Sequence, residues 1–333
     1  MSENIVHIAH PVGHRKAYLD LFVNLTGFKP LIGPVSRQNF LELVSAKKVL
    51  FATVGHAFRR FWLVCLLRSI TGKTTGVIFL GAMRYRTASN LPTSFFDRFL
   101  LKIWKILPKQ RLLAITPYNV EPTLAEVTND YIYDPQMWDL WLENTPVVFP
   151  TTPLSTSVER VKKGKNVLIF IGQTTKQKGF EELVKFAEAN RATLHVVAAG
   201  TVSQECATAV EKLRSLNMTV ENRFITDEEL LSLYGITDYA WSFYPPEYDQ
   251  ASGIFGRAIQ LGVKPVIRTG SVIARTAEQL NIPSIQLEME DFDNEMTARA
   301  ALGKGEVLAP LERQQLFIEL RDESLEKLQR ALR

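Results

Sequence analysis

The feature of this sequence that most constrains its fold is a regular alternation of short apolar runs with longer helical patterns. In the second half of the chain the apolar runs, rich in β-branched residues, lie at Val167–Ile171, Leu194–Ala198, Met218–Phe224, Tyr239–Phe243, Lys264–Arg268 and Ser284–Leu287. Strands that alternate with helices form βαβ units, in which helices cover both faces of a parallel sheet. The alternation therefore predicts a Rossmann-like domain over residues 166–310.

A less regular form of the same alternation runs through the first half of the chain. A chain of 333 residues is longer than one hydrophobic core usually supports, so we expect a second Rossmann-like domain over residues 1–150. The prolines and hydroxyl residues of 151–165 predict an extended linker, and the amphipathic pattern of 311–333 predicts a helix that packs back on the N-terminal domain. The predicted fold class is α/β, with a ligand-binding cleft between two Rossmann-like domains.

The charge of the chain is distributed unevenly. The first 115 residues carry 17 Lys and Arg against 4 Asp and Glu, although the whole chain has a net charge of only +4. A basic face of this kind suits an anionic partner such as a membrane surface, a nucleic acid or a charged substrate. The two cysteines are too few for a disulfide framework, and we see neither a secretion signal nor a membrane-spanning run. We therefore expect a cytoplasmic protein.

Two segments of the second half have the pattern of a phosphate-binding site. In the first, an apolar run ends at Gly172 and a helical pattern begins near Gly179, with Lys176 and Lys178 between them. The free amide groups of a helix start bind phosphate, and neighbouring lysines strengthen that site. The order of residues is not that of a Walker-type nucleotide loop.

In the second segment, residues 242–271, a strand pattern ends in two prolines and Ser252 and Gly253 open a helix. Glycine lets the backbone approach a ligand closely, and this helix start offers further amide donors for a phosphate. Glu247 and Asp249 precede it, where a carboxylate can accept hydrogen bonds from sugar hydroxyls.

Together these segments resemble the donor-binding half of glycosyltransferases with the two-Rossmann-domain (GT-B) architecture, particularly glycosyltransferase family 4. The resemblance covers roughly residues 166–290. The matching residues are Gly172, Lys178, Gly179, Gly262, Pro265, Val266 and Ile267. The family implies a nucleotide-sugar donor, UDP- or GDP-linked, as substrate rather than cofactor, no bound metal, and retention of the anomeric configuration.

The sequence departs from the family pattern at positions that bear on the donor site. Gln173 stands where the family has a phosphate-binding arginine, and Asp249 and Arg257 stand where it has two glutamates. Arg257 cannot accept a hydrogen bond from ribose, and we expect it to pair with a phosphate instead. By the same resemblance, the backbone around Ile225 brackets the nucleotide base, and Asp227 caps the following helix.

In the first half, the turn that ends in Gly13 matches the first glycine loop of the architecture, which faces the donor phosphates. His14 lies at the helix start behind this turn, and His56 follows an apolar strand pattern. We take His14, His56 and Asp249 as the candidate catalytic residues. We predict no metal site, because no cysteine or acidic ligand accompanies the histidines.

Residues 94–111 combine apolar and basic side chains at helical spacing. The apolar residues predicted to share one side are Phe96, Phe99, Leu100, Ile103, Trp104 and Leu107, and the rest of the helix carries Arg98, Lys102 and Lys105. Such a helix suits a membrane interface, where tryptophan and lysine anchor at the headgroups, although a core helix with a basic face has the same pattern.

The predicted function is therefore that of a glycosyltransferase attached peripherally to the inner face of the cell membrane. It would move a sugar from a nucleotide-sugar donor to a lipid-linked or other saccharide acceptor in polysaccharide biosynthesis. The alternatives are a sugar-nucleotide epimerase of the same architecture and a basic nucleic-acid-binding protein. The last is disfavoured because the basic residues alternate with large apolar ones and no nucleic-acid-binding motif is found.

Overall fold

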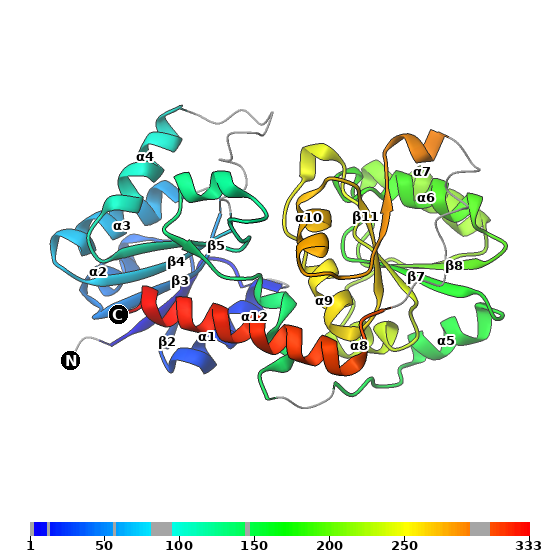
Figure 1. Cartoon of the computed structure of the whole chain (residues 1–333), viewed down its shortest axis with the longest axis horizontal. Coiled ribbons are helices and arrows are strands. Elements are labelled where there is room, and N and C mark those ends of the chain that lie inside the picture. The colour runs from blue at the N-terminus through cyan, green and yellow to red at the C-terminus, as the bar shows by residue number, and fades with distance from the viewer. Residues whose placement is uncertain (1–2, 12–13, 56–57, 81–94, 144–146, 294–306) are drawn as a thin grey trace. The chain divides into compact units, whose positions relative to one another are not determined.

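The computed structural model describes residues 3–11, 14–55, 58–80, 95–143, 147–293 and 307–333. The chain forms two compact units, each built on a parallel six-stranded sheet (Figure 1). The N-terminal unit comprises Met1–Asp139 with Ile318–Arg333, and the C-terminal unit comprises Leu140–Phe317. The predicted α/β class with two Rossmann-like units is thus confirmed, and the boundary falls at residue 139 rather than at 150.

The N-terminal sheet has the strand order β2-β1-β3-β4-β5-β6, with every neighbouring pair parallel. Its strands are β1 (Ile5–Ile8), β2 (Lys29–Ile32), β3 (Lys48–Val54), β4 (Thr74–Phe79), β5 (Gln110–Ala114) and β6 (Asp130–Tyr131). Its helices are α1 (His14–Thr26), α2 (Arg37–Ser45), α3 (Phe58–Ile70) and α4 (Phe95–Ile106). The central strands β1, β3 and β4 are almost entirely buried, as expected for a sheet that helices cover on both faces.

The C-terminal sheet has the strand order β12-β11-β10-β7-β8-β9 and is likewise parallel throughout. Its strands are β7 (Asn166–Ile171), β8 (Leu194–Ala199), β9 (Thr219–Glu221), β10 (Tyr239–Trp241), β11 (Lys264–Arg268) and β12 (Ile285–Leu287). Its helices are α5 (Pro153–Val161), α6 (Phe180–Ala189), α7 (Ala207–Ser215), α8 (Asp227–Tyr234), α9 (Gly253–Leu261) and α10 (Val272–Gln279). Helices α6 and α7 cover one face, and α5, α8 and α9 cover the other.

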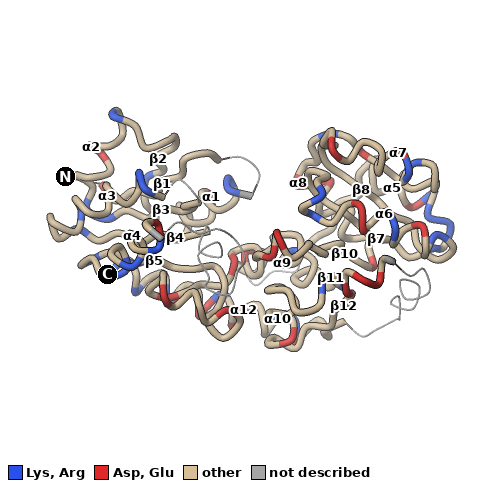
Figure 2. The backbone as a smooth tube through the Cα atoms, turned by 90° about the horizontal axis from the view of Figure 1, so that it is seen from above, with Lys and Arg blue, Asp and Glu red and all other residues tan. Residues whose placement is uncertain are grey.

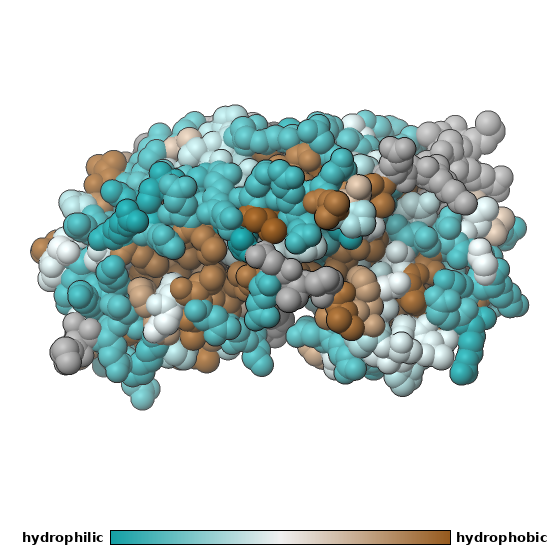
Figure 3. Space-filling model, turned by 60° about the horizontal axis from the view of Figure 1, so that its bottom comes forward, coloured by the Kyte–Doolittle hydropathy of each residue, from teal (hydrophilic) through white to brown (hydrophobic). Residues whose placement is uncertain are grey.

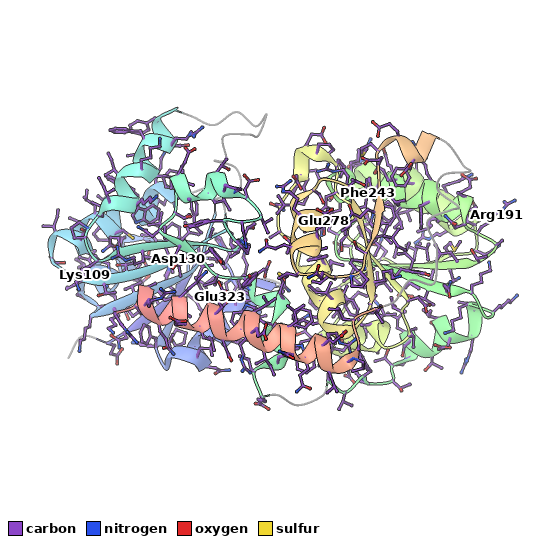
Figure 4. All side chains as sticks on the ribbon, viewed as in Figure 1. Lys109, Asp130, Arg191, Phe243, Glu278 and Glu323 are labelled. Carbon is purple, nitrogen blue, oxygen red and sulfur yellow. The ribbon has the colours of Figure 1, made fainter. Side chains whose placement is uncertain are left out.

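The long helix α12 (Pro310–Ala331) begins in the C-terminal unit and ends on the N-terminal sheet. Its last turn brings Leu332 against Gly76 of β4, where a Cβ would lie only 3.0 Å from the Leu332 side chain. Glu323 accepts a hydrogen bond from Tyr131 and lies 2.7 Å from the ammonium of Lys327 (Figure 4). The helix therefore completes the N-terminal core on the face that α1 also covers.

Three local predictions need correction. The predicted linker contains a helix, α5, because Thr152 and Ser155 form a capping box and proline is well tolerated in a first helical turn. Helix α8 is capped by Thr226 rather than by Asp227, which is its first residue. Trp104 does not lie on an exposed side of α4, because its ring is fully buried and stacks on Phe58.

None of the helices in the described part of the chain is long and apolar enough to cross a membrane. In the view of Figure 3 the surface is mostly hydrophilic, with apolar residues gathered in separate patches.

Arg68 and His7 are basic residues with almost fully buried side chains in the N-terminal unit. The guanidinium of Arg68 donates to Thr75 Oγ1 and to the carbonyls of Leu43, Ala46 and Thr74, at 2.6 to 2.8 Å. Desolvation lowers its pKa to about 10, and these acceptors compensate for the lost hydration. The imidazole of His7, in β1, contacts the Gly33 carbonyl at 2.8 Å, and burial lowers its pKa to about 4.

The depressed pKa of His7 predicts a loss of stability in mild acid. As the pH falls below 6.5, His7 becomes protonated in the unfolded chain, whereas in the folded chain it is protonated only near pH 4. The free energy of unfolding therefore decreases as the pH falls from 6.5 to about 4. The full shift corresponds to about 3 kcal/mol. Urea unfolding at pH 7 and pH 4.5 should show this dependence in the wild type and lose most of it in His7→Leu. Equal pH dependence in both proteins would contradict the prediction.

Candidate functional site

The loops at the carboxyl end of the C-terminal sheet approach each other unusually closely. Gly172 follows β7 with φ 105°, and Gly200 follows β8 with φ 144°. A Cβ on Gly200 would lie 2.1 Å from the carbonyl oxygen of Gly172. The Gly172 amide donates to the Ala199 carbonyl at 2.8 Å, which extends the strand pairing to this point. At position 200 only glycine fits, because a side chain would be strained at this φ and would clash with the Gly172 carbonyl.

The start of α6 is fixed against the end of β10 in a similar way. Gly179, the N-cap of α6, has φ 64°, and a Cβ on it would lie 2.3 Å from the carbonyl oxygen of Phe243. The indole of Trp241 donates to the Gly179 carbonyl at 3.1 Å. Phe243 lies at this carboxyl end of the sheet (Figure 4). The helix start and the strand end therefore form one rigid corner.

Lys178 lies at this corner and is the most informative side chain of the site. Its ammonium lies over Gly172, 3.0 Å from where a Cβ on that glycine would be. The side chain is half-buried, and desolvation lowers its pKa. Within the described residues, nothing hydrogen-bonds or ion-pairs with this ammonium. A desolvated cation without a counterion, beside the free amides of a helix start, is an arrangement that binds an anion.

The other residues predicted on this loop differ from Lys178. Lys176 is exposed, its ammonium lies 3.0 Å from Glu181, and its amide donates to Glu205. Gln173 is exposed at the end of β7. Lys176 is therefore partly neutralised by a carboxylate, whereas Lys178 has no such partner among the described residues.

The second predicted helix start is α9, which begins at Gly253 behind the N-cap Ser252. The Ser252 hydroxyl accepts from the amide of Phe255 at 3.2 Å and lies 2.7 Å from the Tyr244 hydroxyl. This side chain is thus engaged in capping the helix. The amides of Gly253 and Ile254, in the first turn, remain the donors that α9 offers to a ligand.

Asp249 is used to hold the loop that precedes α9. Its carboxylate accepts from the amide of Val272, the first residue of α10, at 2.8 Å and lies 3.5 Å from Arg268. Arg268 also donates to the Tyr244 carbonyl at 2.9 Å. The side chain of Asp249 is only 9% exposed. Its predicted catalytic role stays a prediction, while its described contacts join the loop to β11 and α10.

Arg257 and Ile225 lie on the α8–α9 side of the sheet. Arg257 is half-buried on α9, close enough to the phenol of Tyr234 to oppose the burial-driven rise in the pKa of that group. The side chain of Ile225 is buried in the core of this face, whereas the ring of Phe224 before it is 71% exposed. Their predicted contacts with phosphate and base stay predictions.

The predicted residues of the N-terminal unit cannot be placed in the same detail. Gly13 and His56 lie outside the described residues, and His14 begins α1 with a side chain that also lies outside them. Across the described ranges, no three His, Cys, Asp or Glu side chains form a group able to hold a metal ion.

Some residues that join the segments of the candidate site are not among the candidate residues of the sequence motifs. Gly200, Trp241 and Arg268 each make a contact between segments far apart in the sequence, so no local motif identifies them. The available signal was position for two of them, since Arg268 ends a predicted strand and Gly200 follows one; Trp241 lies in the middle of the predicted strand Tyr239–Phe243.

Comparison with known proteins identifies the architecture. No family model matches the sequence, and no curated protein matches it. Solved structures do match over nearly the whole chain. WaaG, a glycosyltransferase involved in lipopolysaccharide biosynthesis, is 12% identical with a TM-score of 0.55, covering 96% of this chain and 95% of its own.

Two further matches have different activities. An α,α-trehalose-phosphate synthase (UDP-forming) from Burkholderia vietnamiensis is 9% identical with a TM-score of 0.54, over 98% of this chain and 95% of its own. A putative UDP-N-acetylglucosamine 2-epimerase from Listeria monocytogenes is 10% identical with a TM-score of 0.52, over 98% and 97%. These matches confirm the predicted GT-B architecture, and at such identities they show the fold alone.

The close approach at Gly200 predicts a steep cost of adding a side chain. Gly200→Ala should destabilise the C-terminal unit by about 3 kcal/mol, because it adds a clash with Gly172 to an unfavourable φ. Gly164→Ala is the matched control, since Gly164 also has positive φ, 77°, but has open space around it. Thermal and urea unfolding of the two variants provide the comparison, and equal losses would refute the importance of the contact.

Proposed function

We propose that this protein is a glycosyltransferase whose C-terminal unit binds the diphosphate of a nucleotide-sugar donor. The observation that carries the proposal is the unpaired, desolvated ammonium of Lys178 over Gly172, at the start of α6. A diphosphate supplies the charge that this cation lacks. The proposal agrees with the architecture, which the matched glycosyltransferases share.

The chemistry of the transfer explains why a cation belongs at this place. When the bond between the anomeric carbon and the phosphate oxygen breaks, negative charge accumulates on the departing diphosphate. A preorganised cation and helix-start amides stabilise that charge as it develops. We assign this role to Lys178 with the amides of α6 and of Gly253, and a supporting role to Gln173, Lys176 and Arg257. The sugar then passes to a saccharide acceptor, with retention of configuration.

The remaining predicted residues complete this proposal. Gly13 would approach the donor phosphates, and the backbone at Ile225 would flank the base, which is uracil or guanine. His14 and His56 are the candidates for receiving the proton of the acceptor hydroxyl, because imidazole titrates near neutral pH. Asp249 is the third predicted residue, and in this proposal it contributes by holding the loop before α9.

A sugar-nucleotide epimerase is the second candidate function, favoured by the structural match to a putative UDP-N-acetylglucosamine 2-epimerase. It would use the same diphosphate site but need no acceptor. Incubation with nucleotide sugars separates the two: an epimerase converts the donor alone, whereas a glycosyltransferase transfers sugar only when a saccharide acceptor is present.

Removal of the Lys178 charge tests the diphosphate site. In Lys178→Ala the affinity for UDP or GDP should fall by about 1.5 to 3 kcal/mol, the usual contribution of a charge-assisted hydrogen bond. Titration calorimetry with both nucleotides measures the loss. Lys212→Ala is the control, because Lys212, on α7, forms an exposed ion pair with Glu188 of α6. Unchanged affinity in a folded Lys178→Ala protein would exclude this placement of the diphosphate.

We further propose that the N-terminal unit docks on an anionic membrane through the outer surface of α3 and α4. The exposed apolar side chains of this surface are Leu63, Ile70, Phe96, Phe99 and Ile106. Lys and Arg lie along the same two helices (Figure 2). Arg60 and Lys102 are exposed and, among the described side chains, have no ion-pair partner. Apolar side chains with adjacent cations are suited to the headgroup region.

The residues of α4 that we propose for this docking differ from those favoured by the sequence pattern. Trp104 is excluded by its burial, and the ammonium of Lys105 donates to the Ala125 carbonyl. Phe96 and Phe99, both more than half exposed, take the place of the tryptophan as the inserted groups. The acceptor, a lipid-linked or other amphiphilic saccharide, would reach the enzyme from the same membrane, on the inner face of the cell membrane.

Liposome flotation tests the membrane surface. Phe96→Ser with Phe99→Ser should abolish binding to anionic vesicles at low salt, and Lys102→Glu should weaken it by roughly 1 kcal/mol or more. Ile32→Ser with Leu41→Ser is the matched control, since these residues are as exposed and lie on β2 and α2. Activity on a soluble acceptor should survive in every variant. If the wild-type protein does not bind the vesicles, the docking proposal is wrong and this surface of α3 and α4 is exposed to solvent only.

A further inference from the structure

The loop between β10 and α9 is held rigidly at several points. Tyr244 packs edge-to-face on Tyr248 with ring centroids 5.6 Å apart, and its hydroxyl lies 2.7 Å from that of Ser252. Asp249 joins the loop to Arg268 and to the first turn of α10. The short helix η7 (Pro246–Tyr248), at the centre of the loop, is therefore fixed in place before any ligand binds.

This loop carries two carboxylates that are used differently. Asp249 is nearly buried and engaged by two partners from β11 and α10. Glu247, two residues earlier, is exposed, and no residue in the described ranges hydrogen-bonds or ion-pairs with its carboxylate. The carboxylate that is available to accept hydrogen bonds from a ligand is thus Glu247.

Glu247 lies beside the start of α6, where the diphosphate site is proposed. Helix η7 packs against the turn η5 (Lys176–Lys178), which contains Lys178. Burial is the main reason why the pKa of Glu182, in the first turn of α6, is raised. The negative charge of Glu247 contributes to the same rise. The corner thus has one unpaired cation for the diphosphate and an unpaired carboxylate nearby.

We infer that Glu247 selects the sugar of the donor, accepting hydrogen bonds from the hydroxyls of a neutral sugar and repelling an anionic one. The inference rests on the proposed function, because it takes the sugar to continue from a diphosphate bound at Lys178. A carboxylate accepts from two hydroxyls at once, and its charge makes each bond stronger than a neutral one. A uronic acid would bring a third carboxylate next to those of Glu247 and Glu182, while Lys178 is already engaged by the diphosphate.

The experiment measures affinity for matched donors by calorimetry. UDP-glucose, UDP-galactose and UDP-N-acetylglucosamine are compared with UDP-glucuronate and with UDP itself. If GDP is the nucleotide that binds, GDP-mannose and GDP-mannuronate form the matched pair. The wild type should prefer a neutral donor over its uronate by tenfold or more. In Glu247→Gln the preference should fall to about threefold or less, and in Glu247→Ala the affinity for the neutral donor should fall roughly tenfold.

Three controls separate this effect from others. Affinity for the bare nucleotide should stay unchanged in both Glu247 variants, because the nucleotide has no sugar hydroxyl at this position. Glu228→Gln removes an equivalent exposed charge from the first turn of α8, and it should leave the donor preference as in the wild type. The melting temperature verifies folding, which an exposed and unpaired side chain should not affect.

The outcomes distinguish the inference from the function on which it rests. A wild type that binds UDP or GDP, but accepts uronates as well as neutral sugars, overturns the inference alone. So does a Glu247→Ala variant with unchanged affinity for the neutral donor. Failure of both nucleotides to bind the wild type overturns the proposed function and the inference together.

Discussion

The candidate site depends on backbone segments that approach within contact distance at the carboxyl end of one sheet. Gly200 lies against the carbonyl of Gly172, and Gly179 lies against the carbonyl of Phe243. These contacts join the ends of β7, β8 and β10 and leave no room for side chains between them. The start of α6 is therefore placed by backbone packing, which positions Lys178 more precisely than an isolated loop would.

The buried Arg68 and the half-buried Lys178 differ in how the chain compensates for a desolvated charge. Arg68, in the N-terminal unit, donates hydrogen bonds to backbone carbonyls and to a threonine hydroxyl. Its guanidinium is therefore satisfied by the protein itself and needs no ligand. Lys178 is also desolvated, but the described residues supply it with no acceptor. The cost of desolvation is met by backbone and hydroxyl acceptors at Arg68, whereas no described residue offsets it at Lys178. This contrast is the physical argument for an anion site at Lys178.

The loop before α9 divides structural and ligand-binding roles between neighbouring carboxylates. Asp249 stands at the position that the family resemblance assigns to the donor, yet its oxygens hold α10 and Arg268. Glu247 stands outside the family pattern and is unpaired. A sequence motif points to the loop as a whole, whereas the partners of each side chain decide which carboxylate is available for a ligand.

The amino-acid sequence by itself determined the local structure of this protein. The alternation of apolar runs and helical patterns predicted two parallel α/β units, and the glycines near residues 172–179 predicted the helix start at Gly179, because both depend on short-range periodicity and backbone conformation. Only the tertiary structure decided which residues are covered. The apolar pattern of α4 fits an exposed side for Trp104, but the contact with Phe58 places this ring in the core. The contacts of the Asp249 carboxylate with Arg268 and with the Val272 amide could not be read from the sequence either. Burial and pairing are long-range properties, since they depend on segments that the chain brings together only when it folds.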